Sequence, residues 1–143
     1  MLQDTKSDFT VAVSLAPASR TAATYNGTLV SLAGYHSAAV VFSTGDLASG
    51  TATPTIQESA NGTSGWADIA ADRLNCTLAA VSANSTLVIG LTDIGNTTAG
   101  ITKKFVRATI VVAGGSGTLC SAYVIRSNAQ HNPAGGSSTI LIG

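Results

Sequence analysis

Residues 9–15 are FTVAVSL, a run in which an apolar side chain occupies every second position. Alternation with this period is typical of a β-strand, whose successive side chains point to opposite faces. No window of the chain repeats apolar residues at helical spacing over three turns, so the sequence predicts an all-β protein. The first strand is predicted to end at Pro17 and to carry on one face Phe9, Val11, Val13 and Leu15.

Further strand-like runs follow between Gly, Asn and Ser residues that favour turns. Ser37–Ser43 is apolar on both sides, which predicts a strand covered on both faces. Lys103–Val112 is predicted to be a long strand with Arg107 pointing outward, and Gly114–Gly117 a hairpin turn into a strand at Thr118–Arg126. The inward side chains of the long strand would be Val106, Ala108, Ile110 and Val112.

The middle of the chain predicts two hairpins. Thr51–Ser59 contains Pro54, which lacks a backbone donor, so this strand is expected at a sheet edge or with a bulge. Asn61-Gly62 is a strong turn dipeptide, and Trp66–Ala70 would run back beside Thr51–Ser59. The second predicted hairpin pairs two further runs, Leu74–Val81 and Ser85–Leu91.

These runs together predict a single β-sandwich or barrel-like domain of about eight antiparallel strands. The domain is expected over residues 9–126, with an N-terminal arm at 1–8 and a C-terminal arm at 127–143. The first eight residues are polar and resemble no signal peptide, which favours a soluble protein made in the cytoplasm. No apolar run is long enough to span a bilayer, so no membrane partner is expected.

Composition argues for contact with proteins. Charged residues make up only 10% of the chain and the net charge is zero, whereas an average soluble domain has about 25% charged residues. A surface of hydroxyls and small side chains can be desolvated without removing full charges from water. The absence of a basic run disfavours nucleic acid as a partner.

The sequence offers little for catalysis or cofactor binding. His36 and His131 are the only histidines, and no cluster with metal-ligand spacing or nucleophile motif surrounds them. We therefore expect no enzyme activity, no metal and no cofactor. Cys76 and Cys120, both in apolar runs, are expected to be buried thiols rather than a disulfide.

Three features remain as candidate contact residues. Asn128–Ser138 has the composition of a linker, yet it leads to the apolar residues Thr139, Ile140, Leu141 and Ile142. This tip would be a last strand on its own sheet, an arm that binds a neighbouring subunit by pairing or pocket insertion, or disordered. Arg107 is expected to be solvated or to form an intersubunit ion pair. Trp66 is expected in the core, with a role at an interface as the alternative.

An ordered series of motifs covers most of the chain, each a turn followed by a strand. The series consists of Asn26-Gly27, Leu32-Ala33-Gly34-Tyr35, Ser43-Thr44-Gly45, Ser49-Gly50-Thr51, Ile56–Gly62 before Trp66, Lys104-Phe105-Val106-Arg107 and Ile110-Val111-Val112. In this order the stretch from Tyr25 to Arg126 resembles the small structural proteins of tailed bacteriophages, several of which are head decoration or cement proteins. The family pattern usually has an acidic Ser-Asp-Asp-Gly turn, where this chain has Ser59-Ala60-Asn61-Gly62.

The resemblance implies a virion component on the outer capsid surface, made in the host bacterium. Its partners would be the major capsid protein of the phage and copies of itself, most simply as a homotrimer on a local three-fold axis. Two alternatives remain open at this point. One is another virion part such as a head fibre, tail or baseplate module, and the other is a carbohydrate-binding β-sandwich module.

Overall fold

The computed structural model describes residues 9–74, 76–91 and 103–129. Strands dominate this part of the chain, which confirms the all-β prediction, and none of its helices is long and apolar enough to cross a membrane. The elements are β1 (Phe9–Asn26), β2 (Val30–Ser31), β3 (Tyr35–Thr44), β4 (Thr51–Ser59), β5 (Ala67–Asp68), α2 (Ala71–Leu74), β6 (Thr86–Leu91) and β7 (Phe105–Ala129).

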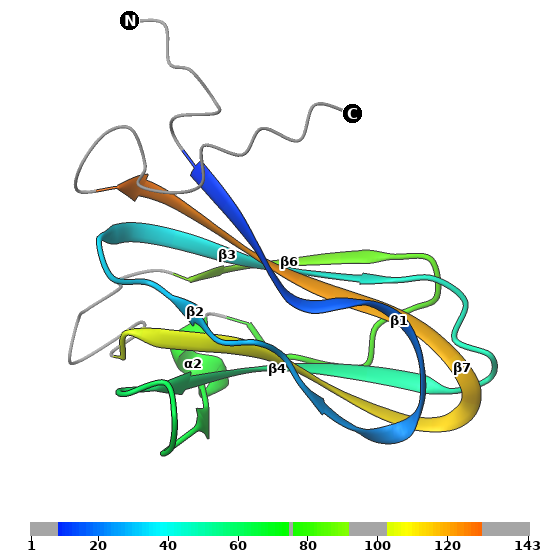
Figure 1. Cartoon of the computed structure of the whole chain (residues 1–143). Coiled ribbons are helices and arrows are strands. Elements are labelled where there is room, and N and C mark those ends of the chain that lie inside the picture. The colour runs from blue at the N-terminus through cyan, green and yellow to red at the C-terminus, as the bar shows by residue number, and fades with distance from the viewer. Residues whose placement is uncertain (1–8, 75, 92–102, 130–143) are drawn as a thin grey trace, which may run out of the picture.

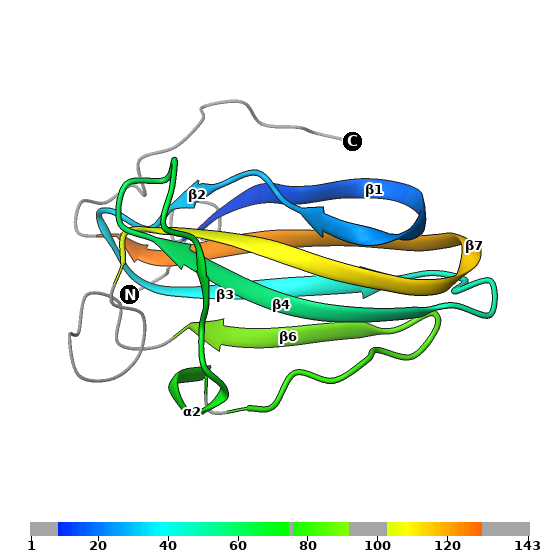
Figure 2. The same cartoon turned by 90° about the horizontal axis from the view of Figure 1, so that it is seen from below.

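All seven strands belong to one antiparallel sheet with the order β5-β4-β7-β3-β6, while β1 and β2 pair with the other edge of β7. The first part of β7 pairs with β4 and the second part with β3. Because β1 and β7 both bend, the sheet curls into a half-barrel with two facing layers (Figures 1 and 2). We call the layer of β6, β3, the end of β7 and the start of β1 the upper layer, and the layer of β5, β4, the start of β7, β2 and the end of β1 the lower layer.

Glycines allow β7 to pass from one layer to the other. Gly114, Gly115 and Gly117 have φ values of 66°, 65° and 112°, a region that side chains with a Cβ rarely adopt. A Cβ on Gly115 would also lie 2.7 Å from the backbone nitrogen of Gly50. The predicted hairpin turn at Gly114–Gly117 is therefore wrong: these residues bend one continuous strand that stays paired with β1 on both sides of the bend.

The predicted end of the first strand at Pro17 is also wrong, because β1 continues to Asn26. Its pairing with β7 shifts between Val13 and Leu15 and again between Leu15 and Ala18. Bulges of this kind accommodate a proline at an edge strand, and they reverse the inward and outward positions. Leu15 therefore points into the core, whereas Val11 and Val13 lie on the outer surface, against the prediction of a single shared face.

The core fills the space between the two layers. The predicted inward set of β7 is confirmed, since Val106, Ala108, Ile110 and Val112 are all buried. Side chains of the other strands meet them at every second position, as a half-buried sheet requires. They include Val40 and Phe42 of β3, Ile56 of β4, and Ile89 and Leu91 of β6, and Val124 from the second part of β7 joins them.

One hydrogen-bonded junction joins Ser14 within β1 and the two residues that follow β1 to Ala108 near the start of β7. The Ser14 hydroxyl donates to the carbonyl of Thr28 at 2.8 Å and accepts from the amide of Ala108 at 2.9 Å. The amide of Gly27 donates to the carbonyl of Ala108 at 2.8 Å. Ser14 is 3% exposed, so these bonds lie in a buried site, where leaving any of them unmade costs the most.

The β4–β5 hairpin is confirmed in short form, with Gln57 opposite Asp68. The side-chain carbonyl of Asn61 accepts from the amides of Thr63 and Ser64 and shapes the predicted turn. Since β5 reaches only the end of β4, Pro54 has a strand on one side alone in the part of the chain that the structure describes, as predicted for an edge position.

The predicted hairpin between Leu74–Val81 and Ser85–Leu91 is wrong. The first run contains the end of α2 and a single bridge from Val81 to Ala52, and β6 pairs with β3 instead. Arg73 of α2 donates to both carboxylate oxygens of Glu58, at 2.7 and 3.0 Å. This ion pair and the burial of Leu74 hold α2 on the lower layer.

The predicted boundary of the C-terminal arm also changes. Strand β7 continues through Ser127 to Ala129, opposite Tyr35 of β3. The predicted arm at 127–143 therefore begins within the sheet. The rest of it and the N-terminal arm at 1–8 lie outside the described residues.

Candidate functional site

The outer face of the upper layer is the strongest candidate for a contact surface. Two rows of side chains cross four strands there, since residues opposite one another in an antiparallel sheet share a face. The register aligns Val11 of β1, Ile125 of β7, Ala39 of β3 and Gly90 of β6 in one row. It aligns Val13, Tyr123, Val41 and Val88 in the next. We call these eight residues the docking face.

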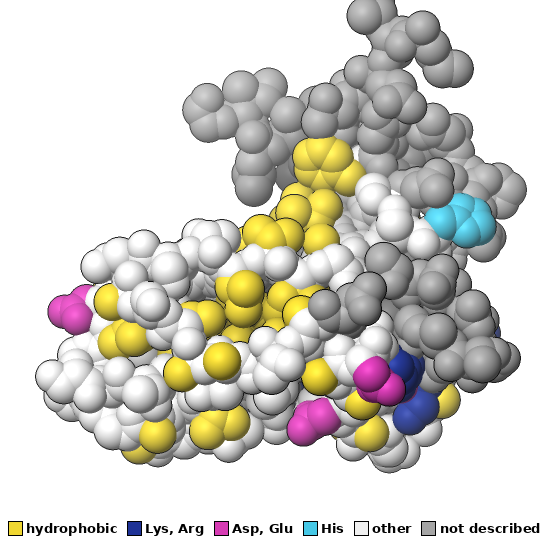
Figure 3. All heavy atoms as spheres, turned by 180° about the vertical axis from the view of Figure 1, so that it is seen from behind, with side chains coloured by type: hydrophobic (Ala, Val, Ile, Leu, Met, Phe, Trp, Pro, Cys, Tyr) yellow, Lys and Arg dark blue, Asp and Glu magenta, His cyan; other side chains and the backbone are white. Residues whose placement is uncertain are grey.

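The docking face is apolar and accessible to solvent. Val88 is 62% exposed, Val11 55% and Val13 48%, while Val41, Tyr123 and Ile125 are half-buried. In the view from behind, the charged side chains lie toward the ends and the lower side of the molecule, with hydrophobic side chains between them (Figure 3). A contiguous patch of this kind on a small domain marks a surface for another apolar surface.

No charge interrupts this face. The rows that flank it are Phe9, Ser127 and Ser37 at one end and Ser121, Ser43 and Thr86 at the other. Hydroxyl groups lose less free energy than charges when water is removed. The whole outer surface of the upper layer can therefore be covered by a partner without an ion having to leave water.

The sequence contained part of this signal. The run Ser37–Ser43 was predicted to be covered on both faces because it is apolar on both sides. Its inner side chains are buried, but within the described residues no element covers Ala39 and Val41 on the outer face. Among the described residues this apolar strand is packed against other elements on its inner face only, which is the pattern expected of an interface.

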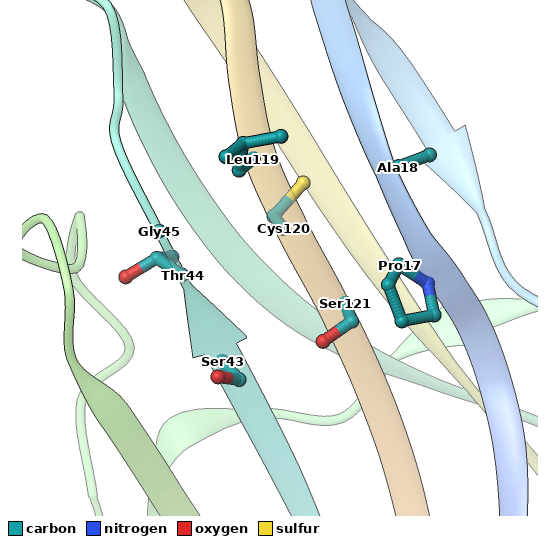
Figure 4. A pocket seen from close by; sticks show the side chains of 8 residues that line it. All are labelled: Pro17, Ala18, Ser43, Thr44, Gly45, Leu119, Cys120 and Ser121. Carbon is teal, nitrogen blue, oxygen red and sulfur yellow. The ribbon is translucent and has the colours of Figure 1, made fainter.

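A groove of about 400 Å³ adjoins the docking face. Three segments line it: Pro17 and Ala18 of β1, Leu119–Ser121 of β7, and Ser43–Gly45 at the end of β3 (Figure 4). Ser43 and Ser121 also form the flanking row, so the groove extends the face along the sheet. Leu119 is 44% exposed there and adds apolar surface to the groove.

Arg107 lies on the outer face of the lower layer, in a local network. Its Nε and Nη2 donate to the side-chain oxygen of Gln57 at 2.9 and 2.7 Å. Gln57 in turn donates to Asp68 at 2.9 Å. The guanidinium carbon is 4.3 Å from the centre of the Trp66 ring, a cation–π contact, and burial lowers the pKa of Arg107.

This arrangement revises two predictions from the sequence. Trp66 is half-buried, stacks on Arg107 and is not among the residues of the core cluster, so its predicted place in the core is wrong. Arg107 points outward as predicted, but it is held by neighbours of its own chain. Its predicted ion pair with another subunit stays a prediction, as does the role of Thr139, Ile140, Leu141 and Ile142, which lie outside the described residues.

The two cysteines are free thiols, Cys120 buried and Cys76 half-buried. Burial raises the pKa of Cys120, while the nearby Arg20 acts in the opposite direction. Among residues 9–74, 76–91 and 103–129 no group of three His, Cys, Asp or Glu side chains comes together to hold a metal ion.

Comparison with known proteins gives no further guide. No protein-family model, no curated protein and no solved structure matches this chain. The function must therefore be inferred from the surfaces described above.

Proposed function

We propose that this chain is a capsid decoration protein of a tailed bacteriophage, and that the docking face binds the lattice of the major capsid protein. The observation that carries the proposal is an uncharged, apolar surface across β1, β7, β3 and β6. The resemblance of residues 25–126 to phage structural proteins supports the same function. The low charge of the whole chain supports close packing against neighbours.

The size of the face sets how it would bind. Four strands spaced about 4.8 Å apart, and about 3.4 Å per residue from Ser121 to Ser127, give the docking face and its two flanking rows together an area of roughly 400 Å². A stable interface takes about 800 Å² from each partner. One docking face alone is therefore a weak contact, and tight binding needs several contacts at once.

Repetition supplies those contacts. On a homotrimer, three docking faces would meet three equivalent sites of the lattice, and each bound copy would raise the effective concentration of the next. A protein that binds only the mature shell stabilises it by mass action. Weak single contacts also leave the free protein soluble until a shell is present.

Substitution of the face tests the proposal. Val13→Asp with Val88→Asp places two carboxylates on a surface that must lose its water when the partner binds. The control, Val111→Asp, places a carboxylate on the outer face of the lower layer, where Val111 is 39% exposed. Co-sedimentation with expanded phage heads should show at least about tenfold weaker binding of the double variant, equal to about 1.4 kcal/mol. The Val111→Asp control should bind like the unaltered protein.

Two results would count against the proposal. If the double variant folds and binds heads as tightly as the unaltered chain, the docking face is not the contact surface. If the unaltered chain does not sediment with heads and is missing from purified particles by mass spectrometry, it is not a decoration protein.

A further inference from the structure

Strand β6 forms one end of the sheet and carries part of the docking face. It pairs with β3 along one edge, from Thr86 opposite Ser43 to Leu91 opposite Ala38. Among residues 9–74, 76–91 and 103–129 no strand pairs with its other edge, and no backbone hydrogen bond from a turn or loop reaches it. We call this second edge of β6 the open edge.

Three residues direct their backbone groups to the open edge. In an antiparallel pair, every second residue turns both its amide and its carbonyl toward the same neighbouring strand. The amide of Thr44 donates to the carbonyl of Ser85 at 2.9 Å, so Ser85 and every second residue after it face β3. Thr86, Val88 and Gly90 therefore direct their amides and carbonyls to the open edge.

The sequence of β6 does not protect this edge. Edge strands of natural proteins usually carry a lysine, a proline or a bulge that prevents pairing with another chain. Thr86–Leu91 is TLVIGL, with no charge and no proline, and its six pairs with β3 follow one register without a shift. Val88 near its centre is 62% exposed. Such an edge is suited to accept a further strand.

A second copy of β6 is complementary to the open edge. In an antiparallel pair centred on Val88, this residue lies opposite Val88 of the second copy, and Thr86 lies opposite Gly90 of the second copy. All three open-edge residues then exchange their hydrogen bonds with the other chain. Any other register leaves at least one of them without a partner in β6. The two Val88 side chains become cross-strand neighbours on the outer face and cover one another.

We infer that two copies of this chain pair through β6 about a two-fold axis at Val88 and join their docking faces into one surface. Because opposite residues of a pair share a face, both docking faces lie on the same side of the joined sheet. Two faces with their flanking rows give roughly 800 Å², the area that a stable interface takes from each partner. The inference goes beyond the proposed function, since the pairing needs no capsid. It gives a two-fold pair in place of the homotrimer expected from the resemblance.

The mass of the protein in solution tests the pairing. Sedimentation velocity at concentrations up to about 1 mM should show a dimer. Val88→Lys should weaken this dimer at least about tenfold, because two ammonium groups then meet at the two-fold axis. The matched control, Val111→Lys, places the same charge on the lower layer, where Val111 is 39% exposed, and should dimerise like the unaltered protein. Circular dichroism checks that both variants fold.

A disulfide locates the contact independently of the charged variants. In a Cys76→Ala background, Val88→Cys should link two copies under oxidised glutathione, because opposite residues of an antiparallel pair have Cα atoms about 5.5 Å apart. Val13→Cys lies on the same row three strands away, so it should form at least about ten times less linked dimer. Peptide mapping by mass spectrometry measures both products.

Four results would overturn the inference. They are a chain that stays monomeric up to about 1 mM, a trimer, a Val88→Lys variant that dimerises like the Val111→Lys control, and linkage through position 13 that equals or exceeds linkage through position 88. The last result would indicate that two docking faces pack against one another. Neither measurement uses phage heads, so the inference can fail while the proposed function stands.

Discussion

Gly27 offers the sharpest test of how the half-barrel closes. A Cβ at this position would come closest to the hydroxyl of Ser14 and would lie 2.7 Å from the carbonyl of Ser14 and 2.8 Å from that of Ala108. All three atoms belong to the junction of Ser14, Gly27, Thr28 and Ala108. Relief of the overlap must move backbone or break the hydrogen bonds of Ser14 and Gly27.

The magnitude follows from these contacts. Overpacking in a filled site costs about 1–3 kcal/mol, and each lost hydrogen bond adds about 1 kcal/mol. Gly27→Ala should therefore lower the free energy of unfolding by about 3 kcal/mol and the Tm by about 10 °C. Urea unfolding followed by far-ultraviolet circular dichroism measures the first quantity, and thermal unfolding measures the second.

Gly90→Ala is the matched control. A Cβ at Gly90 meets no atom within 4 Å, and the strand position of Gly90 suits any residue, so this change should be neutral or stabilise by about 0.5 kcal/mol. If Gly27→Ala unfolds within about 1 kcal/mol of the unaltered protein, as the control does, the junction does not constrain the curl of the sheet.

Other side chains give further predictions. Arg73→Met should destabilise by about 3 kcal/mol at pH 7, because it removes the guanidinium from a carboxylate whose side chain is 4% exposed. Burial alone would raise the pKa of Glu58, but the hydrogen bond and charge of Arg73, together with the charge and a backbone hydrogen bond of Lys103, outweigh burial and hold that pKa below its ordinary value of 4.5. The stabilisation by the ion pair is therefore present above pH 4.5 and is lost as the pH falls through the lowered pKa. The free energies of unfolding of the Arg73→Met and unaltered proteins should converge in acid. A difference that stays constant with pH would contradict this. At pH 8 iodoacetamide should label Cys76 at least about ten times faster than Cys120, because the buried thiol of Cys120 is both covered and harder to ionise; equal labelling by mass spectrometry would show that the core opens readily.

The sequence predicted the strands better than their connections. Alternation from Val106 to Val112 identified the inner face of β7 because regular pairing preserves the period of two. The same alternation gave a wrong prediction in β1, because bulges shift the register and place Leu15 inside and Val13 outside. Gly114–Gly117 was misread because glycines serve a tight turn and a bent strand equally well, and only the pairing with β1 distinguishes them.

The docking face could be anticipated only in part. The two-sided apolar character of Ser37–Ser43 indicated a strand that needs cover on both sides. Its neighbours on the outer face come from Val11–Val13, Tyr123–Ile125 and Val88, which only the register of the folded sheet brings together. The stack of Trp66 on Arg107 was missed for the same reason, since the contact joins β7 to the turn before β5.

The most direct measurement of the central claim is a cryo-electron microscopy reconstruction of the intact phage particle that contains this chain. The account predicts hundreds of copies on the outer surface of the head, with Val11, Val13, Val41 and Val88 turned toward the major capsid protein. A head without the chain, or a bound copy whose β1–β7–β3–β6 surface faces solvent, would contradict it.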